Sequence, residues 1–187
     1  IKAMYSLEEV KLKIAAKTPL ILAGDENLLN QLPKGNWIGG TIPYFMGDEG
    51  GEQTKDKLLV TEIPSYALET KISLYTEENI HNVYNDAYEN GFSVILIPAF
   101  SKVQLSFSIN APYYEYFASK SLLGWVTGLH LGDLGKTTPK IYSGIDGKFY
   151  ENAAIVMHVS LGYDKFAEIG IINIFKLGEG DVIEFEE

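Results

Sequence analysis

The sequence predicts an α/β fold with a mixed sheet core and flanking helices, and the same elements also fit an α+β arrangement. Short apolar runs of strand length alternate with segments that carry helix-capping residues. Two short strings that contain the only two tryptophans lie about 88 residues apart. A chain of 187 residues with 46% hydrophobic residues can bury a sizeable core, and we expect one domain over residues 1–187.

The charged residues limit the classes of molecule that the chain can bind. The formal net charge is -10, and all fifteen basic residues are lysines. Because arginine supplies the planar donor pair that suits phosphate and guanine, and because a negative field repels polyanions, we expect no nucleic-acid partner. The absence of cysteine excludes disulfides, thiol nucleophiles and cysteine-bound zinc.

The absence of a membrane span and of an export signal predicts the cellular compartment. No apolar run reaches the roughly 18 residues that a membrane span needs, and no basic start precedes an apolar core. We therefore expect a cytoplasmic protein without a membrane partner. The sequence begins with Ile1, so it leaves open whether a signal peptide was removed upstream.

The first elements have clear local signals. Ser6 and Glu9 form a capping box, which predicts a helix over residues 7–16. Residues 20–23 are a continuous apolar run, as in a strand that is covered on both faces. Asp25 then suits the N-cap of a short helix that ends near Leu32.

A glycine-rich stretch follows. Residues 36–42 are predicted as a strand, residues 47–57 as an acidic, glycine-rich loop, and residues 58–63 as a returning strand. The local order is strand, helix, strand, loop, strand.

The middle of the chain predicts a parallel crossover. Residues 70–75 alternate as a strand, Thr76 suits an N-cap, and apolar residues recur at helical spacing over residues 77–90. Residues 92–97 follow as a buried strand. A strand, a helix and a second strand in this order favour a right-handed crossover.

The next segment has a two-residue period. Residues 103–109 alternate apolar and polar, which predicts a strand with one wet face. Pro112 suits the first turn of a helix that runs to about residue 123.

The remaining elements are strands. Asp146-Gly147 within residues 141–150 predicts a hairpin, and residues 153–161 predict a buried strand. Residues 169–175 and 182–185 predict a closing antiparallel pair.

The two tryptophan strings suggest an internal correspondence. They read Trp37-Ile38-Gly39-Gly40 and Trp125-Val126-Thr127-Gly128. Each follows an apolar strand and a helix, and each precedes a loop and another apolar strand. The pattern predicts two related β-α-β-β halves at residues 18–68 and 92–161, with a cleft between them as the natural place for a ligand.

These motifs resemble the sensory domains called FIST. The resemblance rests on residues 37–41, on residues 124–128, and on the hairpin that leads into residues 154–157. It covers roughly residues 20–161 and implies a domain that binds small ligands in bacterial signalling. The sequence also resembles a small uncharacterised bacterial family, which implies no functional residues.

The candidate ligand-binding residues follow the two tryptophan strings. Two adjacent carboxylates between glycines can divide acid and base roles or bind a hard cation, and a histidine with a nearby carboxylate can face a cleft. The predicted ligand-binding residues are Thr41, Tyr44, Asp48, Glu49, His130 and Asp133.

Other signals are weaker. We interpret His81 as a surface residue and His158 as a hydrogen-bonded strand residue. No spacing of histidines predicts a metal site, and no glycine pattern predicts a nucleotide cofactor, so the cofactor is unknown.

We therefore expect a small-molecule-binding or regulatory domain. An enzyme that acts on a small metabolite, with Glu49 or His130 as the proton-transfer group, is the first alternative. A structural or interaction protein without a ligand is the second, and the sequence is compatible with a homo-oligomer.

Overall fold

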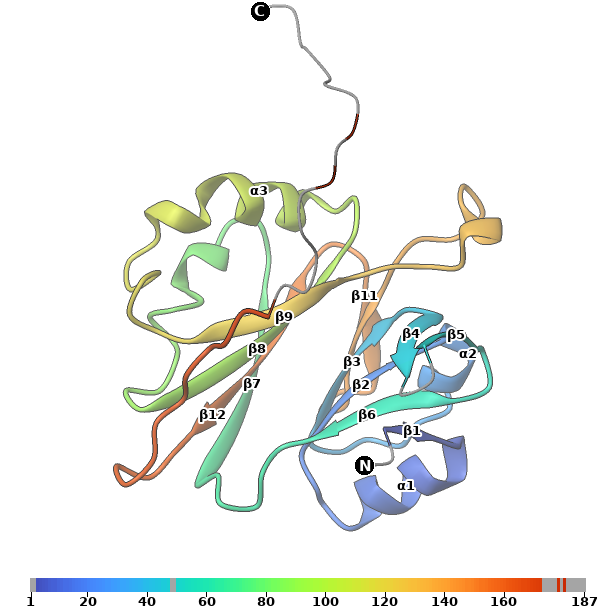
Figure 1. The fold of residues 1–187 in the computed structure, drawn as a ribbon, viewed down its shortest axis with the longest axis horizontal. Coiled ribbons are helices and arrows are strands. Elements are labelled where there is room, and N and C mark those ends of the chain that lie inside the picture. Colours follow the sequence, from blue (N-terminus) through green and yellow to red (C-terminus); the bar gives the residue numbers. More distant parts are fainter. Residues whose placement is uncertain (1–2, 48–49, 173–177, 179, 181–187) are drawn as a thin grey trace, which may run out of the picture.

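A computed structural model describes residues 3–47, 50–172, 178 and 180. Its strands form two sheets and a separate hairpin (Figure 1). The six-stranded sheet has the order β1 (Met4–Tyr5), β6 (Leu58–Glu62), β2 (Leu20–Gly24), β3 (Trp37–Thr41), β10 (Ile141–Ser143) and β11 (Lys148–Tyr150). The four-stranded sheet has the order β7 (Glu69–Tyr75), β12 (Ala154–Ser160), β8 (Gly91–Pro98) and β9 (Leu122–Thr127). The hairpin joins β4 (Tyr44–Gly47) to β5 (Gly50–Gln53).

The helices are short. They are α1 (Leu7–Ala15), α2 (Glu26–Leu29) and α3 (Lys102–Asn110), with the 3₁₀ turns η1 (Ile80–Asn82), η2 (Ala111–Tyr113) and η3 (Leu131–Asp133). Mixed sheets with a few helices fit the α+β form of the prediction. Among the described residues, no helix is long and apolar enough to cross a membrane.

Part of each sheet has the same strand order. In the six-stranded sheet, β2 pairs parallel with β3 and antiparallel with β6, which in turn pairs with β1. In the four-stranded sheet, β8 pairs parallel with β9 and antiparallel with β12, which in turn pairs with β7. The orders β1-β6-β2-β3 and β7-β12-β8-β9 therefore match in position and direction.

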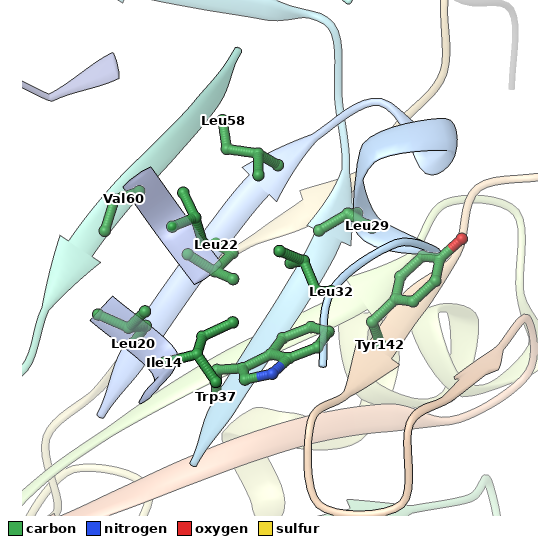
Figure 2. Packing of buried hydrophobic residues seen from close by; sticks show 10 residues of the cluster. Ile14, Leu20, Leu22, Leu29, Leu32, Trp37, Leu58, Val60 and Tyr142 are labelled. Carbon is green, nitrogen blue, oxygen red and sulfur yellow. The ribbon is translucent and has the colours of Figure 1, made fainter. Parts of the chain in front are cut away.

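Three apolar clusters divide the molecule into layers. One cluster lies between the six-stranded sheet and the helices α1 and α2, and Figure 2 shows its residues. A second contains residues of both sheets, including Ile38 of β3 and Ile155 of β12. A third lies between the four-stranded sheet and the segment with η1 and α3. The order is helices, sheet, sheet, helices.

The strand β3 shows how the sequence produces these layers. Successive side chains of a strand face opposite sides. Trp37 packs with α1 and α2, and its indole nitrogen donates to the carbonyl oxygen of Pro33 at 2.9 Å (Figure 2). Ile38 faces the other sheet.

The predicted N-terminal elements are confirmed. Ser6 and Glu9 form both bonds of the capping box at the start of α1. The strand β2 is buried over its full length, and the Asp25 side chain accepts from the backbone nitrogen of Asn27 as the N-cap of α2. The hairpin at Asp146-Gly147 is β10–β11.

The predicted helix over residues 77–90 is wrong, since this segment contains turns and η1. The Asn79 side chain accepts from the backbone nitrogen of Thr76 at 2.7 Å, and Thr76 makes no helix cap. Asparagine and aspartate are frequent here, and their side chains compete with helical backbone bonds. Ile80 and Val83 still reach the apolar core.

The predicted strand over residues 103–109 is also wrong, because these residues form α3. Ser101 caps the helix by accepting from the backbone nitrogen of Gln104 at 3.1 Å. Val103 and Phe107, four residues apart, pack inward. The outward positions are apolar as well, which produced the misleading two-residue alternation.

Three further expectations change. The predicted helix over residues 112–123 is wrong: only η2 forms, and Tyr116 has a φ of 64° that a helix does not allow. The predicted loop over residues 47–57 contains part of the hairpin β4–β5. The strands β7 and β8 run parallel, but β12 lies between them.

The predicted C-terminal pair lies mostly outside the described residues. Residues 173–175 and 182–185 are not described, and residues 169–172 form no strand.

Candidate functional site

A polar cleft lies at the carboxyl ends of three strands. It has a volume of about 250 Å³ and is lined by residues that follow β2, β3 and β9. The backbone nitrogen of Gly128, directly after β9, donates to the carbonyl oxygen of Thr41 at 2.7 Å and joins the two sheets. In open sheets with parallel strands, ligands bind outside the carboxyl ends of the strands. The cleft therefore lies where the fold favours a ligand.

Lys55 connects two acidic groups of the cleft. Its Nζ lies 2.9 Å from Oδ2 of Asp133 and 3.8 Å from Oδ2 of Asp25. The hydrogen bond with Lys55 holds the pKa of Asp133 below its usual value, and the same bond raises the pKa of Lys55. Both groups are therefore charged at neutral pH.

His130 is held in one orientation. Its Nδ1 accepts from the backbone nitrogen of Gly132 at 3.1 Å, and its Nε2 lies 2.8 Å from the side-chain amide of Gln53. The Tyr44 ring stacks on the imidazole, with ring centroids 5.8 Å apart, and its hydroxyl accepts from the backbone nitrogen of Leu131 at 3.1 Å. Because Nδ1 accepts from Gly132, the proton of a neutral imidazole is on Nε2, and the Gln53 side chain must then turn its amide oxygen, not its nitrogen, towards that proton.

A nearly buried lysine supports the wall of the cleft. The Lys140 ammonium donates to the Glu26 carboxylate and, at 3.1 Å, to Oγ1 of Thr137. The backbone nitrogen of Lys140 donates to Oγ1 of Thr41 at 2.9 Å. Lys140 thus connects α2 with β3 and with the segment before β10.

Some of the predicted ligand-binding residues lie at the cleft. Thr41, His130 and Asp133 line the cleft, and Tyr44 adjoins it through His130. Asp48 and Glu49 lie outside the described residues. Their role as ligand-binding residues stays a prediction.

Sequence reasoning missed three charged residues. Asp25 follows a predicted strand, a position that could have suggested a site, but its capping role explained it fully. Lys55 and Lys140 carry no local signal, because their carboxylate partners are distant in the sequence.

A family model describes residues 5–187 as a family of unknown function, DUF6976. The chain belongs to this family. No curated protein and no solved structure matches the chain. The family fixes no activity, and the similarity to FIST sensory domains stays a prediction.

A second polar cluster lies inside the four-stranded sheet. Ser93 Oγ is 2.8 Å from Nδ1 of His158, and the Tyr75 hydroxyl is 3.0 Å from Nε2 of the same ring. The Tyr75 hydroxyl donates to Oδ2 of Asp86 at 2.9 Å. Since that proton points to Asp86, the tyrosine oxygen accepts from Nε2, and Nδ1 accepts from Ser93. The four side chains thus form one chain of hydrogen bonds, in which Ser93 donates to His158, His158 to Tyr75 and Tyr75 to Asp86.

This cluster is closed to ligands. Ser93, Tyr75 and His158 are buried, and burial lowers the pKa of His158 to about 4. The imidazole is neutral at physiological pH. His158 is therefore a hydrogen-bonded strand residue, as predicted, and His81 is exposed, as predicted. In the described part of the chain, no group of three or more metal-ligating side chains occurs.

Proposed function

We propose that this chain is a small-molecule-binding regulatory domain whose ligand occupies the polar cleft. The observation that carries the proposal is that charged groups of both signs, from segments far apart in the sequence, meet around one cavity of about 250 Å³. This cavity is smaller than the roughly 300 to 1,000 Å³ of sites for drug-sized ligands. The proposed ligand is accordingly small.

The proposal includes two related halves, with the cleft between them. The matching strand orders support this reading and extend the predicted halves to include β1 and β7. A hairpin also follows the same strand in each half: β4–β5 lies between β3 and β6, and β10–β11 lies between β9 and β12. The segments that follow the two tryptophan strings both reach the cleft.

The charges favour a polar ligand that carries both a cationic and an anionic group. Asp25 and Asp133 can accept from an ammonium group, and Lys55 can donate to a carboxylate. In the free chain these groups pair with one another. An amino-acid-like molecule can replace both halves of that pairing, which a molecule with charges of only one sign cannot do.

The orientation of His130 favours binding over proton transfer. Both ring nitrogens have partners within the chain, Gly132 and Gln53. A general base needs a free nitrogen within reach of the substrate proton. We therefore assign His130 to positioning the segment that carries Asp133.

The regulatory part of the proposal rests on the contacts between the hairpin and η3. Tyr44 and Gln53 of the hairpin touch His130 and Leu131, and Lys55 directly beyond it pairs with Asp133. A ligand that replaces the Lys55–Asp133 contact changes how the hairpin and η3 are joined. Another protein can recognise such a change by binding one of the two arrangements more tightly.

Thermal unfolding in the presence of the standard amino acids, polyamines and dicarboxylates tests the proposal. A ligand at a hundredfold excess over its Kd stabilises the folded state by about 2.7 kcal/mol, which raises Tm by roughly 5 to 10 °C for a chain of this size. We expect such a shift with an amino-acid-like compound and none with polyamines or dicarboxylates, whose charges are all of one sign.

Two matched variants locate the binding. Lys55→Met removes the cationic group of the cleft and should abolish the shift. Lys57→Met removes a neighbouring exposed lysine, which pairs with Glu52 at 3.5 Å and does not line the cleft, and should leave the shift unchanged. Equal effects of the two substitutions, or no shift with any compound class, would overturn the proposal.

A further inference from the structure

One sheet edge lacks the usual protection against pairing with another chain. Natural proteins shorten edge strands or place charges on them. The edge strands β1 and β11 have two and three residues, and β7 carries Glu69 and Lys71. The edge strand β9 has six residues, Leu-Leu-Gly-Trp-Val-Thr, with no charge and no proline. In the described part of the chain it pairs only with β8.

An apolar groove lies beside this edge. It has a volume of about 490 Å³ and runs between α3 and β9, with Phe107, Phe117 and Leu122 among its lining residues. On β9 itself, Leu123 and Val126 are each 46% exposed. An uncovered apolar edge next to an apolar groove is typical of a site that accepts an extended segment.

The C-terminal segment begins at the start of the same strand. The Asn90 side-chain amide donates to the carbonyl oxygens of Leu161, Gly162 and Lys165 at 3.2, 2.9 and 3.0 Å. Phe166 then lines a small cavity together with residues 119–121, directly before β9. The segment after Phe166 is therefore anchored near the amino end of the bare edge.

This segment is apolar, strand-prone and exposed. Residues 169–175 read Ile-Gly-Ile-Ile-Asn-Ile-Phe, and β-branched and aromatic residues favour strands. Ile171 and Ile172 are 92% and 91% exposed. The five residues 168–172 can span roughly 17 Å as a strand, and the six residues of β9 span roughly 20 Å, so the segment can pair along most of this edge.

We propose that two copies of this chain exchange these segments, so that residues 168–172 of each copy pair with the β9 edge and groove of the other. The occupant is a second copy because Ile171 and Ile172, so exposed, do not cover the chain's own edge. Reciprocal exchange buries both apolar surfaces and closes a two-fold dimer.

The charge of the chain sets the salt dependence. Each copy carries a net charge of -10, and like-charged copies repel each other. Because the proposed contact is apolar, added salt screens the repulsion and should strengthen the dimer. An interface formed by ion pairs would weaken instead.

Engineered cysteines test the exchange, since the natural chain has none. A double variant with Ile172→Cys and Val126→Cys should form a disulfide-linked dimer under mild oxidation, seen on a non-reducing gel. The control pairs Ile172→Cys with Leu12→Cys, on an exposed position of α1, and should stay monomeric. A link within one chain means that the segment folds back on its own edge, and this result, like equal linking in the control, would overturn the proposal.

Mixing two variants gives an independent readout. Ile171→Asp with Ile172→Asp disables the segment and keeps the groove, whereas Leu123→Lys with Val126→Lys disables the edge and keeps the segment. Light scattering after size-exclusion chromatography should show a dimer for the natural chain, monomers for each variant alone, and a heterodimer for the mixture. All altered side chains are exposed or half exposed, so folding should persist. A monomeric natural chain at every concentration and salt level contradicts the proposal.

Discussion

The two parts of the molecule with matching strand order use polar groups differently. Around β2 and β3, charged groups lie outside the carboxyl ends of the strands, where Lys55 pairs with Asp25 and remains accessible to solvent. Around β8 and β12, the polar groups lie within the sheet, where Ser93 and His158 are buried. One topology thus places charged groups of one part at an accessible cleft and encloses a polar cluster within the sheet of the other.

The two sheets also differ in what lies beside their parallel pair of strands. The hairpin β10–β11 extends the six-stranded sheet by pairing with β3, so this parallel pair has no free edge. In the four-stranded sheet, β9 pairs with no second strand among the described residues. Strand order places the strand ends, and the added segments decide whether a position serves a ligand, a partner or stability alone.

The largest expected effect concerns the close backbone contact in the second part. A Cβ at Gly124 would lie 1.8 Å from the carbonyl oxygen of Ile95, and rigid backbone cannot yield. Gly124→Ala should therefore cost more than about 3 kcal/mol of the free energy of unfolding, lowering Tm by more than roughly 6 °C. Thermal unfolding followed by circular dichroism measures the change.

The matched substitution lies in the first part. A Cβ at Gly39 would lie 3.1 Å from the end of the Leu29 side chain and 3.2 Å from the Trp37 ring, and side chains can shift by the few tenths of an ångström that this contact needs. Gly39→Ala should cost about 1 kcal/mol. If both variants lost the same stability, the two parallel pairs would be packed alike, and this difference between the parts would not hold.

The second expected effect concerns His158 and pH. Its pKa is about 4 in the folded chain, against an ordinary value of 6.5, because burial disfavours the charged ring. The folded state binds fewer protons than the unfolded state between these values. Stability from this group is therefore complete above pH 6.5 and falls as the pH drops towards 4, by roughly 3 kcal/mol in total.

Urea unfolding at a series of pH values separates this group from the carboxylates. His158→Gln should flatten the loss of stability between pH 6.5 and 4, whereas His81→Gln, at an exposed position, should leave the curve unchanged. Parallel curves for all three chains would show that the buried cluster does not control the acid sensitivity.

Local signals in the sequence predicted most strands and the first helix. The capping box at Ser6 needed only nearby residues, as did the Asp-Gly turn of β10–β11. The alternation over residues 103–109 misled because α3 exposes apolar side chains, including Leu105 and Ile109, opposite its buried face. A periodic pattern assigns a structure only where a single face is apolar.

The sequence predicted those residues of the candidate site that lie at the end of a strand or shortly after it. Thr41 ends β3, and His130 follows β9 closely, so a reading of strand boundaries could place both. The hydrogen-bonded carboxylate partners of Lys55 and Lys140, Asp133 and Glu26, lie 78 and 114 residues away in the sequence. Contacts of this range depend on how the sheets stack, and a single sequence carries no signal for them.

The smallest expected effect distinguishes the accessible cleft from the buried cluster. Tyr44→Phe removes the hydroxyl that accepts from the backbone nitrogen of Leu131, but it keeps the ring on His130. Because water can replace this partly exposed hydrogen bond, the loss of stability should be about 1 kcal/mol or less. Tyr113→Phe, at an exposed position on η2, is the control and should not change the stability.

The same Tyr44 variant should reduce the ligand-induced Tm shift, since the hairpin and η3 are held less firmly around the cleft. A large loss of stability without any change in ligand response would instead make the hairpin contact part of the folding core, and the two parts of the molecule would then use their polar groups for the same purpose.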